Sequence, residues 1–105
     1  MEVSLVFLGD RAMRAVNKKW HKHDAQSNVL AFRLDQSIGE IFINPYQAQR
    51  EARMHGVSQT ARTVYLFVHG LLHIYGYDHH TKQGAFEMNQ REDTILKTAT
   101  YKQQS

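Results

Sequence analysis

The chain has 105 residues and no cysteine. Disulfide bonds are therefore impossible, and metal sites built from thiolates are excluded. The absence suits a reducing compartment, and we expect a cytoplasmic protein. Long apolar runs are missing as well. The apolar stretch at residues 3–8 is too short for a secretory signal, and the one around Phe67 is interrupted by His69 and Gly70. The sequence therefore predicts neither a signal peptide nor a membrane span.

A strong charge of either sign is also absent. The formal net charge is +3 and the sequence pI is about 9.3, which permits a polyanionic partner without requiring one. The distribution is less even, because five of the thirteen Lys and Arg residues fall in one short segment beside His21 and His23. They are Arg11, Arg14, Lys18, Lys19 and Lys22. This segment is either a track for RNA phosphates or the solvated face of an ordinary helix.

The most informative feature is the run H-G-L-L-H-I-Y-G-Y-D-H at residues 69–79. His69 and His73 are four residues apart, so both project from one side of a helix. Gly76 can end that helix, and the chain can then turn so that His79 meets the other two. Three neutral imidazoles can hold one Zn²⁺ and leave a coordination position for water, as in catalytic zinc sites. We predict His69, His73 and His79 as zinc ligands.

The same run lacks one catalytic group. In H-E-x-x-H zinc proteases the residue after the first histidine is the glutamate base. Gly70 stands at that position here, so peptide hydrolysis by that route has no base. Asp78 is the nearest carboxylate. It could orient a ligand histidine, act as the general base, or be a simple turn carboxylate.

Periodicity and capping residues predict the elements of one domain. We expect a buried strand at residues 3–8, a helix at 10–20, and an antiparallel hairpin of strands at 28–33 and 39–43. Helices follow at 45–54, at 58–75 with both helical histidines, and from 81 or 82 to about 98. Met13, Val16 and Trp20 form the apolar stripe of the first helix, so all three are predicted to lie in the core.

The histidine run resembles the signature of the YbeY family of bacterial endoribonucleases, also called rRNA maturation factors. Three further stretches resemble the family. They are D-A-Q-S-N-V-L-A-F at residues 24–32, I-G-E-I-F-I-N at 38–44, and the M-x-x-x-E spacing of Met88 and Glu92. The resemblance covers about residues 3 to 97. By this resemblance the chain lacks the first strand and helix that are usual in the family. His21 stands where members usually carry an arginine.

The resemblance implies an α+β fold, with a mixed sheet of about three strands against about four helices in a single domain at residues 1–105. It places one zinc ion on a central helix and the loop after it, held by His69, His73 and His79. It implies a zinc-dependent endoribonuclease that cleaves single-stranded RNA in 16S rRNA 3′-end maturation and ribosome quality control, with the small ribosomal subunit as partner. Asp78 and His21 are then the catalytic candidates.

Two other functions remain open. The first is a metal-dependent hydrolase of another substrate, such as a peptide, which the ligand spacing allows and Gly70 disfavours. The second is a non-catalytic ribosome- or RNA-binding module with structural zinc. The replacement of arginine by His21 favours this module, whereas structural zinc more often has four protein ligands.

Overall fold

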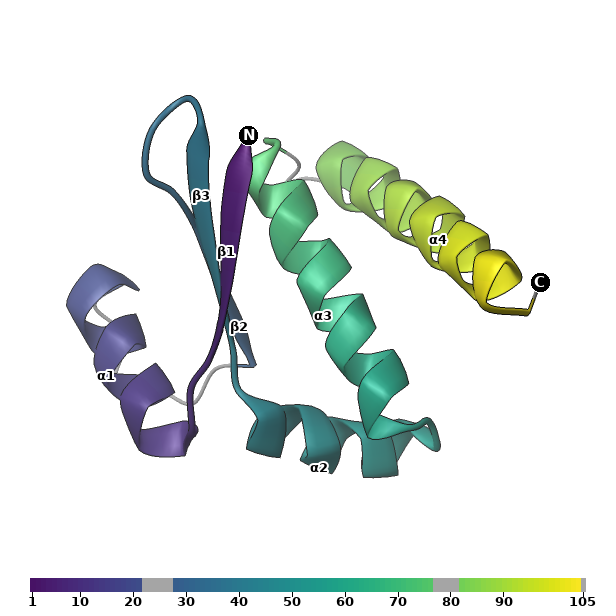
Figure 1. Cartoon of the computed structure of the whole chain (residues 1–105), viewed down its shortest axis with the longest axis horizontal. Coiled ribbons are helices and arrows are strands. Elements are labelled where there is room, and N and C mark those ends of the chain that lie inside the picture. The colour runs from purple at the N-terminus through teal and green to yellow at the C-terminus, as the bar shows by residue number, and fades with distance from the viewer. Residues whose placement is uncertain (22–27, 77–81, 105) are drawn as a thin grey trace.

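A computed structural model describes residues 1–21, 28–76 and 82–104 of the chain (Figure 1). The order of elements is β1 (Glu2–Phe7), α1 (Asp10–His21), β2 (Val29–Arg33), β3 (Ile38–Ile43), α2 (Pro45–His55), α3 (Gln59–Ile74) and α4 (Lys82–Gln104). The sheet order is β1-β3-β2, with β1 parallel and β2 antiparallel to β3. The predicted α+β fold with a mixed three-stranded sheet and four helices is therefore confirmed for the described residues.

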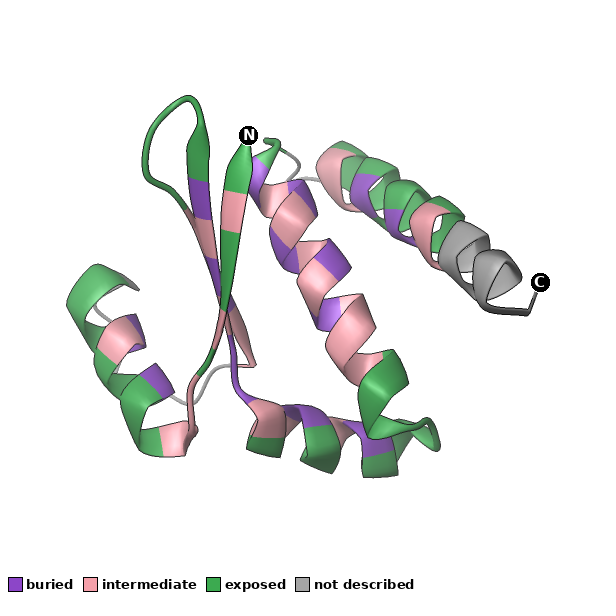
Figure 2. Cartoon of the chain, in the orientation of Figure 1, coloured by how far each residue is buried: buried purple, intermediate pink, exposed green. Residues whose placement is uncertain are grey.

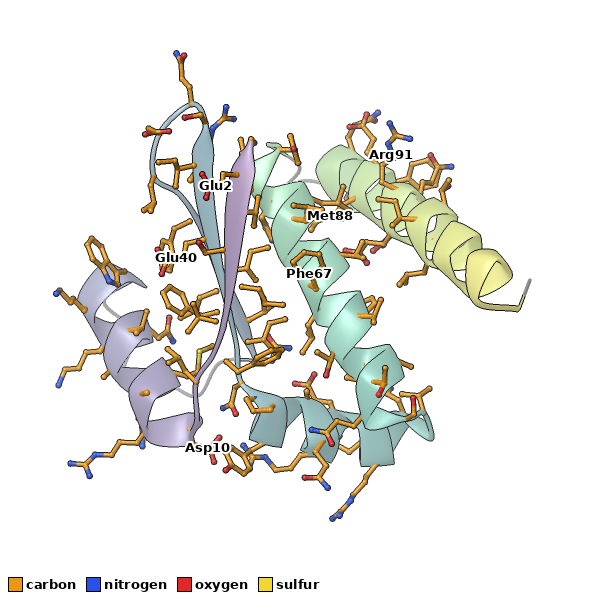
Figure 3. The ribbon with its side chains drawn as sticks, viewed as in Figure 1. Glu2, Asp10, Glu40, Phe67, Met88 and Arg91 are labelled. Atoms are coloured by element: carbon orange, nitrogen blue, oxygen red, sulfur yellow. The ribbon has the colours of Figure 1, made fainter. Side chains whose placement is uncertain are left out.

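The elements form layers around the sheet. Helix α1 lies on one face, α3 on the other, and α4 packs on the far side of α3 (Figure 1). The main core joins β3 to α3 through Ile41, Ile43, Leu66 and Ile74. A second cluster, Val68, Leu72 and Met88, joins α3 to α4 (Figure 3). Helix α3 is thus held on two sides, which makes it a rigid support for side chains on its remaining faces.

Capping groups set where the helices begin. Asn44 is fully buried, and its side-chain oxygen accepts hydrogen bonds from the backbone N–H groups of Tyr46 and Gln47. Its amide nitrogen donates to Asp10 Oδ1 at 2.7 Å, which ties the start of α2 to the start of α1. Ser58 caps α3 in the same manner, through the N–H of Ala61. These are the residue types that a sequence uses to fix helix starts.

Two expectations about burial are wrong. Strand β1 was expected to be buried, but Leu5 is 42% and Phe7 53% exposed (Figure 2). The reason is that β1 is an edge strand, and α3 packs on β2 and β3. Trp20 was expected in the core with Met13, but it is 63% exposed while Met13 is buried. Trp20 lies in the last turn of α1 and contacts Phe32 on β2, the opposite edge strand, so the sheet ends beneath it.

Candidate metal centre

Helix α3 brings two of the three predicted zinc ligands together. His69 and His73 lie one turn apart, with ring centroids 4.9 Å apart and an interplanar angle of 71°. Both side chains are partly buried. His79 and Asp78 fall outside the described residues, and no three His, Asp or Glu side chains within the described ranges form a metal-binding group. The predicted trio therefore stays a prediction, with two members placed side by side.

The described histidine pair has a buried carboxylate partner on the neighbouring helix. Glu92 of α4 is only 3% exposed, and its Oε1 lies 2.6 Å from Nδ1 of His69. When the carboxylate is ionised and His69 is neutral, Nδ1 donates in this contact and Nε2 keeps a lone pair that can ligate a metal. A carboxylate behind a ligand histidine fixes the tautomer and the ring orientation. The donor chemistry of His69 and His73 thus fits a zinc ion.

Tyr65 stands one turn before His69 on the same side of α3. The two rings are stacked, with centroids 6.1 Å apart and an interplanar angle of 29°. Burial raises the pKa of Tyr65, and the charge of Glu92 and a hydrogen bond to it raise this pKa further. The raised pKa keeps the hydroxyl of Tyr65 protonated, so Tyr65 places a hydrogen-bond donor near the carboxylate that contacts His69.

A brace of polar side chains anchors the first half of α3. Glu51 of α2 accepts hydrogen bonds from Arg62 at 2.8 Å, from Gln47 at 3.2 Å and from Asn28 at 3.2 Å. Burial alone would raise the pKa of Glu51, but these three donors together outweigh it and lower the pKa. The guanidinium of Arg62 also lies 4.6 Å above the ring of Tyr65. The brace connects α2, α3 and the start of β2 to the histidine side of α3.

Gly70 faces the sheet. A Cβ added there would lie 3.2 Å from Cγ2 of Ile41 and 3.3 Å from Cγ2 of Val29. A glutamate in this position would therefore be directed into the core and away from the histidine pair. Helix α3 therefore could not place the glutamate base of the H-E-x-x-H motif beside the histidines even if residue 70 were a glutamate. This counts against a protease-like reaction.

The comparisons with known proteins identify the family of the chain. A model of the family described as "Endoribonuclease YbeY" matches residues 1–100. The chain belongs to the YbeY family. The Endoribonuclease YbeY of Allorhizobium ampelinum is 38% identical over 104 residues, covering 90% of this chain and 62% of that protein. The one from Moorella thermoacetica is 36% identical over 110 residues, covering 90% of this chain and 70% of that protein. This chain thus spans about two thirds of the length of these YbeY proteins.

The fold is also shared with a solved structure. The solution structure of TM1509 from Thermotoga maritima matches with a TM-score of 0.66 at 24% identity, covering 90% of this chain and 65% of that one. This likeness concerns the fold alone. It shows that the layers described above persist when three quarters of the aligned residues differ.

The second catalytic candidate, His21, is the last residue of α1. Its side chain lies outside the described part of the chain, so its role stays a prediction. Helix α1 packs on the sheet face opposite α3, so His21 and the histidine pair belong to different layers (Figure 1).

Glu92 contacts the histidine pair, and the sequence alone did not predict this contact. Asp78, for which orienting a histidine was one of three open roles, lies outside the described residues, whereas Glu92 contacts Nδ1 of His69. A signal was present, because Glu92 follows Met88 by four residues and so puts an acid on the apolar face of α4. A lone carboxylate on an inner stripe indicates a buried partner.

Proposed function

We propose that this chain binds one Zn²⁺ through His69, His73 and His79 and cleaves single-stranded RNA. We further propose that it acts in the cytoplasm on the small ribosomal subunit, in 16S rRNA 3′-end maturation and ribosome quality control. The observation that supports it most is the 2.6 Å contact between Glu92 and Nδ1 of His69. That contact prepares His69 to present Nε2 beside His73, and membership of the YbeY family supplies the RNA substrate class.

The residues of the chain have separate tasks in this proposal. Glu92 keeps the proton on Nδ1 of His69, and the ring of Tyr65 stacks on the ring of His69 and supports its orientation. Zinc, when bound, supplies a Lewis acid for a phosphodiester oxygen. Asp78 is proposed to position or deprotonate the attacking water, and His21 to contact the RNA as the cation that replaces arginine. Because histidine is charged only at lower pH, that contact should weaken as the pH rises.

The direct test measures zinc content and RNA cleavage together. Wild type should hold one zinc per chain and cut a single-stranded RNA, while His73→Ala should lose both. His55→Ala is the matched control, because His55 is an exposed histidine at the end of α2 and should keep both properties. Full zinc content in His73→Ala would overturn the ligand assignment.

A second measurement separates the nuclease from a non-catalytic module. If the zinc-loaded protein binds small-subunit particles but cleaves no single-stranded RNA at saturating zinc, the site is structural and the nuclease proposal is wrong. Cleavage that disappears in His73→Ala and persists in His55→Ala supports the nuclease.

A further inference from the structure

Trp20 is the only tryptophan of the chain, and it is 63% exposed at the end of α1. One side of its ring rests on Phe32 of β2, with centroids 6.1 Å apart and an interplanar angle of 57°. Phe32 is in turn fixed edge-on by Phe42 of β3, with centroids 6.0 Å apart. The indole is therefore supported from below by a row of aromatic rings while most of its surface faces solvent.

The surroundings of this ring are positively charged. Nζ of Lys19 lies 5.3 Å from the centroid of the Trp20 ring. Residues 11–20 of α1 contain no acid and carry four exposed basic side chains, Arg11, Arg14, Lys18 and Lys19. The acid at the start of the helix, Asp10, is engaged by Arg50 at 2.6 Å and by Asn44 at 2.7 Å. The positive charge beside Trp20 comes from Lys18 and Lys19, and residues 11–20 hold no acid that would offset it.

Acidic side chains on the neighbouring sheet face determine where the phosphates and where the uncharged part of a ligand can lie. Glu40 pairs with Phe32 in the sheet register, so it lies on the same face as the aromatic row, and Glu2 lies on that face of β1 (Figure 3). These carboxylates repel phosphates from the sheet surface and leave the outer side of α1 as the favourable path for them. A flat, uncharged group is then the part of the ligand that suits the ring.

We propose that Trp20 is a stacking platform for one base of single-stranded RNA, with Lys18 and Lys19 contacting the adjacent phosphates. The proposal rests on the proposed nuclease function and adds a second place, distant from the metal centre, where the protein holds the RNA. An exposed aromatic ring among basic side chains is the composition of sites for single strands, because only unpaired bases offer an open face. Trp20 contacts Phe32 on β2 and α3 also packs on β2, so this strand joins the ring to the layer that carries the histidine pair.

The single tryptophan makes the platform directly observable. In EDTA, which removes metal and prevents cleavage, a single-stranded RNA of about ten nucleotides should quench the Trp20 fluorescence in a saturable manner. Inorganic polyphosphate should compete for the basic side chains without quenching. Absence of quenching at an RNA concentration where anisotropy of a labelled oligomer shows saturation would overturn the proposal.

Substitutions supply the matched comparison. Trp20→Ala should weaken RNA binding by about 5- to 150-fold, the loss expected for one stacked base, and Trp20→Phe should recover most of it. Phe86→Ala is the control, because Phe86 is a similarly exposed aromatic, 61%, on α4 and away from the basic helix. Wild-type affinity in Trp20→Ala would contradict the platform. So would a concentration-dependent shift of Trp20 emission without RNA, since a second copy of the chain would then cover the ring.

The two proposals fail in distinguishable ways. Quenching by RNA without any zinc-dependent cleavage would overturn the nuclease and support the platform. Cleavage lost in His73→Ala but with no quenching would support the nuclease and overturn the platform.

Discussion

Replacing Glu92 should weaken zinc binding although Glu92 is not itself a proposed ligand. Its carboxylate is 3% exposed, and its Oε1 lies 2.6 Å from Nδ1 of His69, whose side chain is 23% exposed. Outer partners of this kind typically change metal affinity by about 10- to 100-fold. Glu92→Ala removes the acceptor entirely, so we expect it near the upper end of that range, equivalent to about 2.7 kcal/mol. Glu92→Gln retains an amide oxygen in the same position, so we expect it near the lower end, about 1.4 kcal/mol.

The assay is competition for Zn²⁺ between the protein and a coloured chelator, with the helical content of each variant checked by circular dichroism. Glu87→Gln is the control, since Glu87 is an exposed glutamate on the same helix and hydrogen-bonds Gln83. We expect it to bind zinc as wild type does. If Glu92→Ala keeps its fold and the wild-type zinc affinity, the contact with His69 is irrelevant to metal binding and the reasoning about the tautomer is refuted.

Three further predictions concern folding. Gly70→Glu should cost at least about 3 kcal/mol, because its carboxylate would be buried against Ile41 without a partner; a thermal melt like that of wild type would contradict this. Asn44→Ala should cost about 1 to 3 kcal/mol in urea unfolding, since it loses the cap of α2 and the bond to Asp10; an unchanged midpoint would show that water replaces both. The pKa of Glu51 in the folded protein lies below the ordinary value of 4.5, so the stabilisation from Glu51 is complete above pH 4.5 and is lost as the pH falls through the folded pKa. Glu51→Gln should therefore make the free energy of unfolding depend less on pH in this acid range. An unchanged pH profile would show that other carboxylates cause the acid unfolding.

The features that were predictable from sequence are those with local causes. Ser58 and Asn44 are capping residues whose own side chains satisfy the first backbone N–H groups of a helix, so they mark α3 and α2 directly. The histidine pair was predictable because helical spacing alone places residues 69 and 73 on one side. The mixed sheet was predicted from the family resemblance, because no single segment of the sequence shows which strands pair with each other.

The features that were missed depend on distant parts of the chain. Trp20 lies on the same apolar stripe of α1 as the buried Met13. It is nevertheless exposed, because the sheet ends at the strand that carries Phe32. Leu5 and Phe7 have the pattern of a buried strand, but α3 is centred over the other two strands. The partner of His69 comes from 23 residues further along the chain, on a helix whose docking no local pattern specifies. The spacing of residues within one segment determines which side chains share a face, whereas the segment that packs on that face depends on distant parts of the chain.

The position of β1 has a practical consequence for anyone who produces this protein. Met1 leads directly into a strand whose outer side has no pairing partner within the described residues, and unpaired strand edges readily recruit other extended chains. An affinity tag fused ahead of Met1 would emerge beside that edge and could dock on it, altering solubility and self-association. The opposite end of the chain leaves from α4, on the far side of the molecule (Figure 1). A purification handle placed there lies away from the edge of β1.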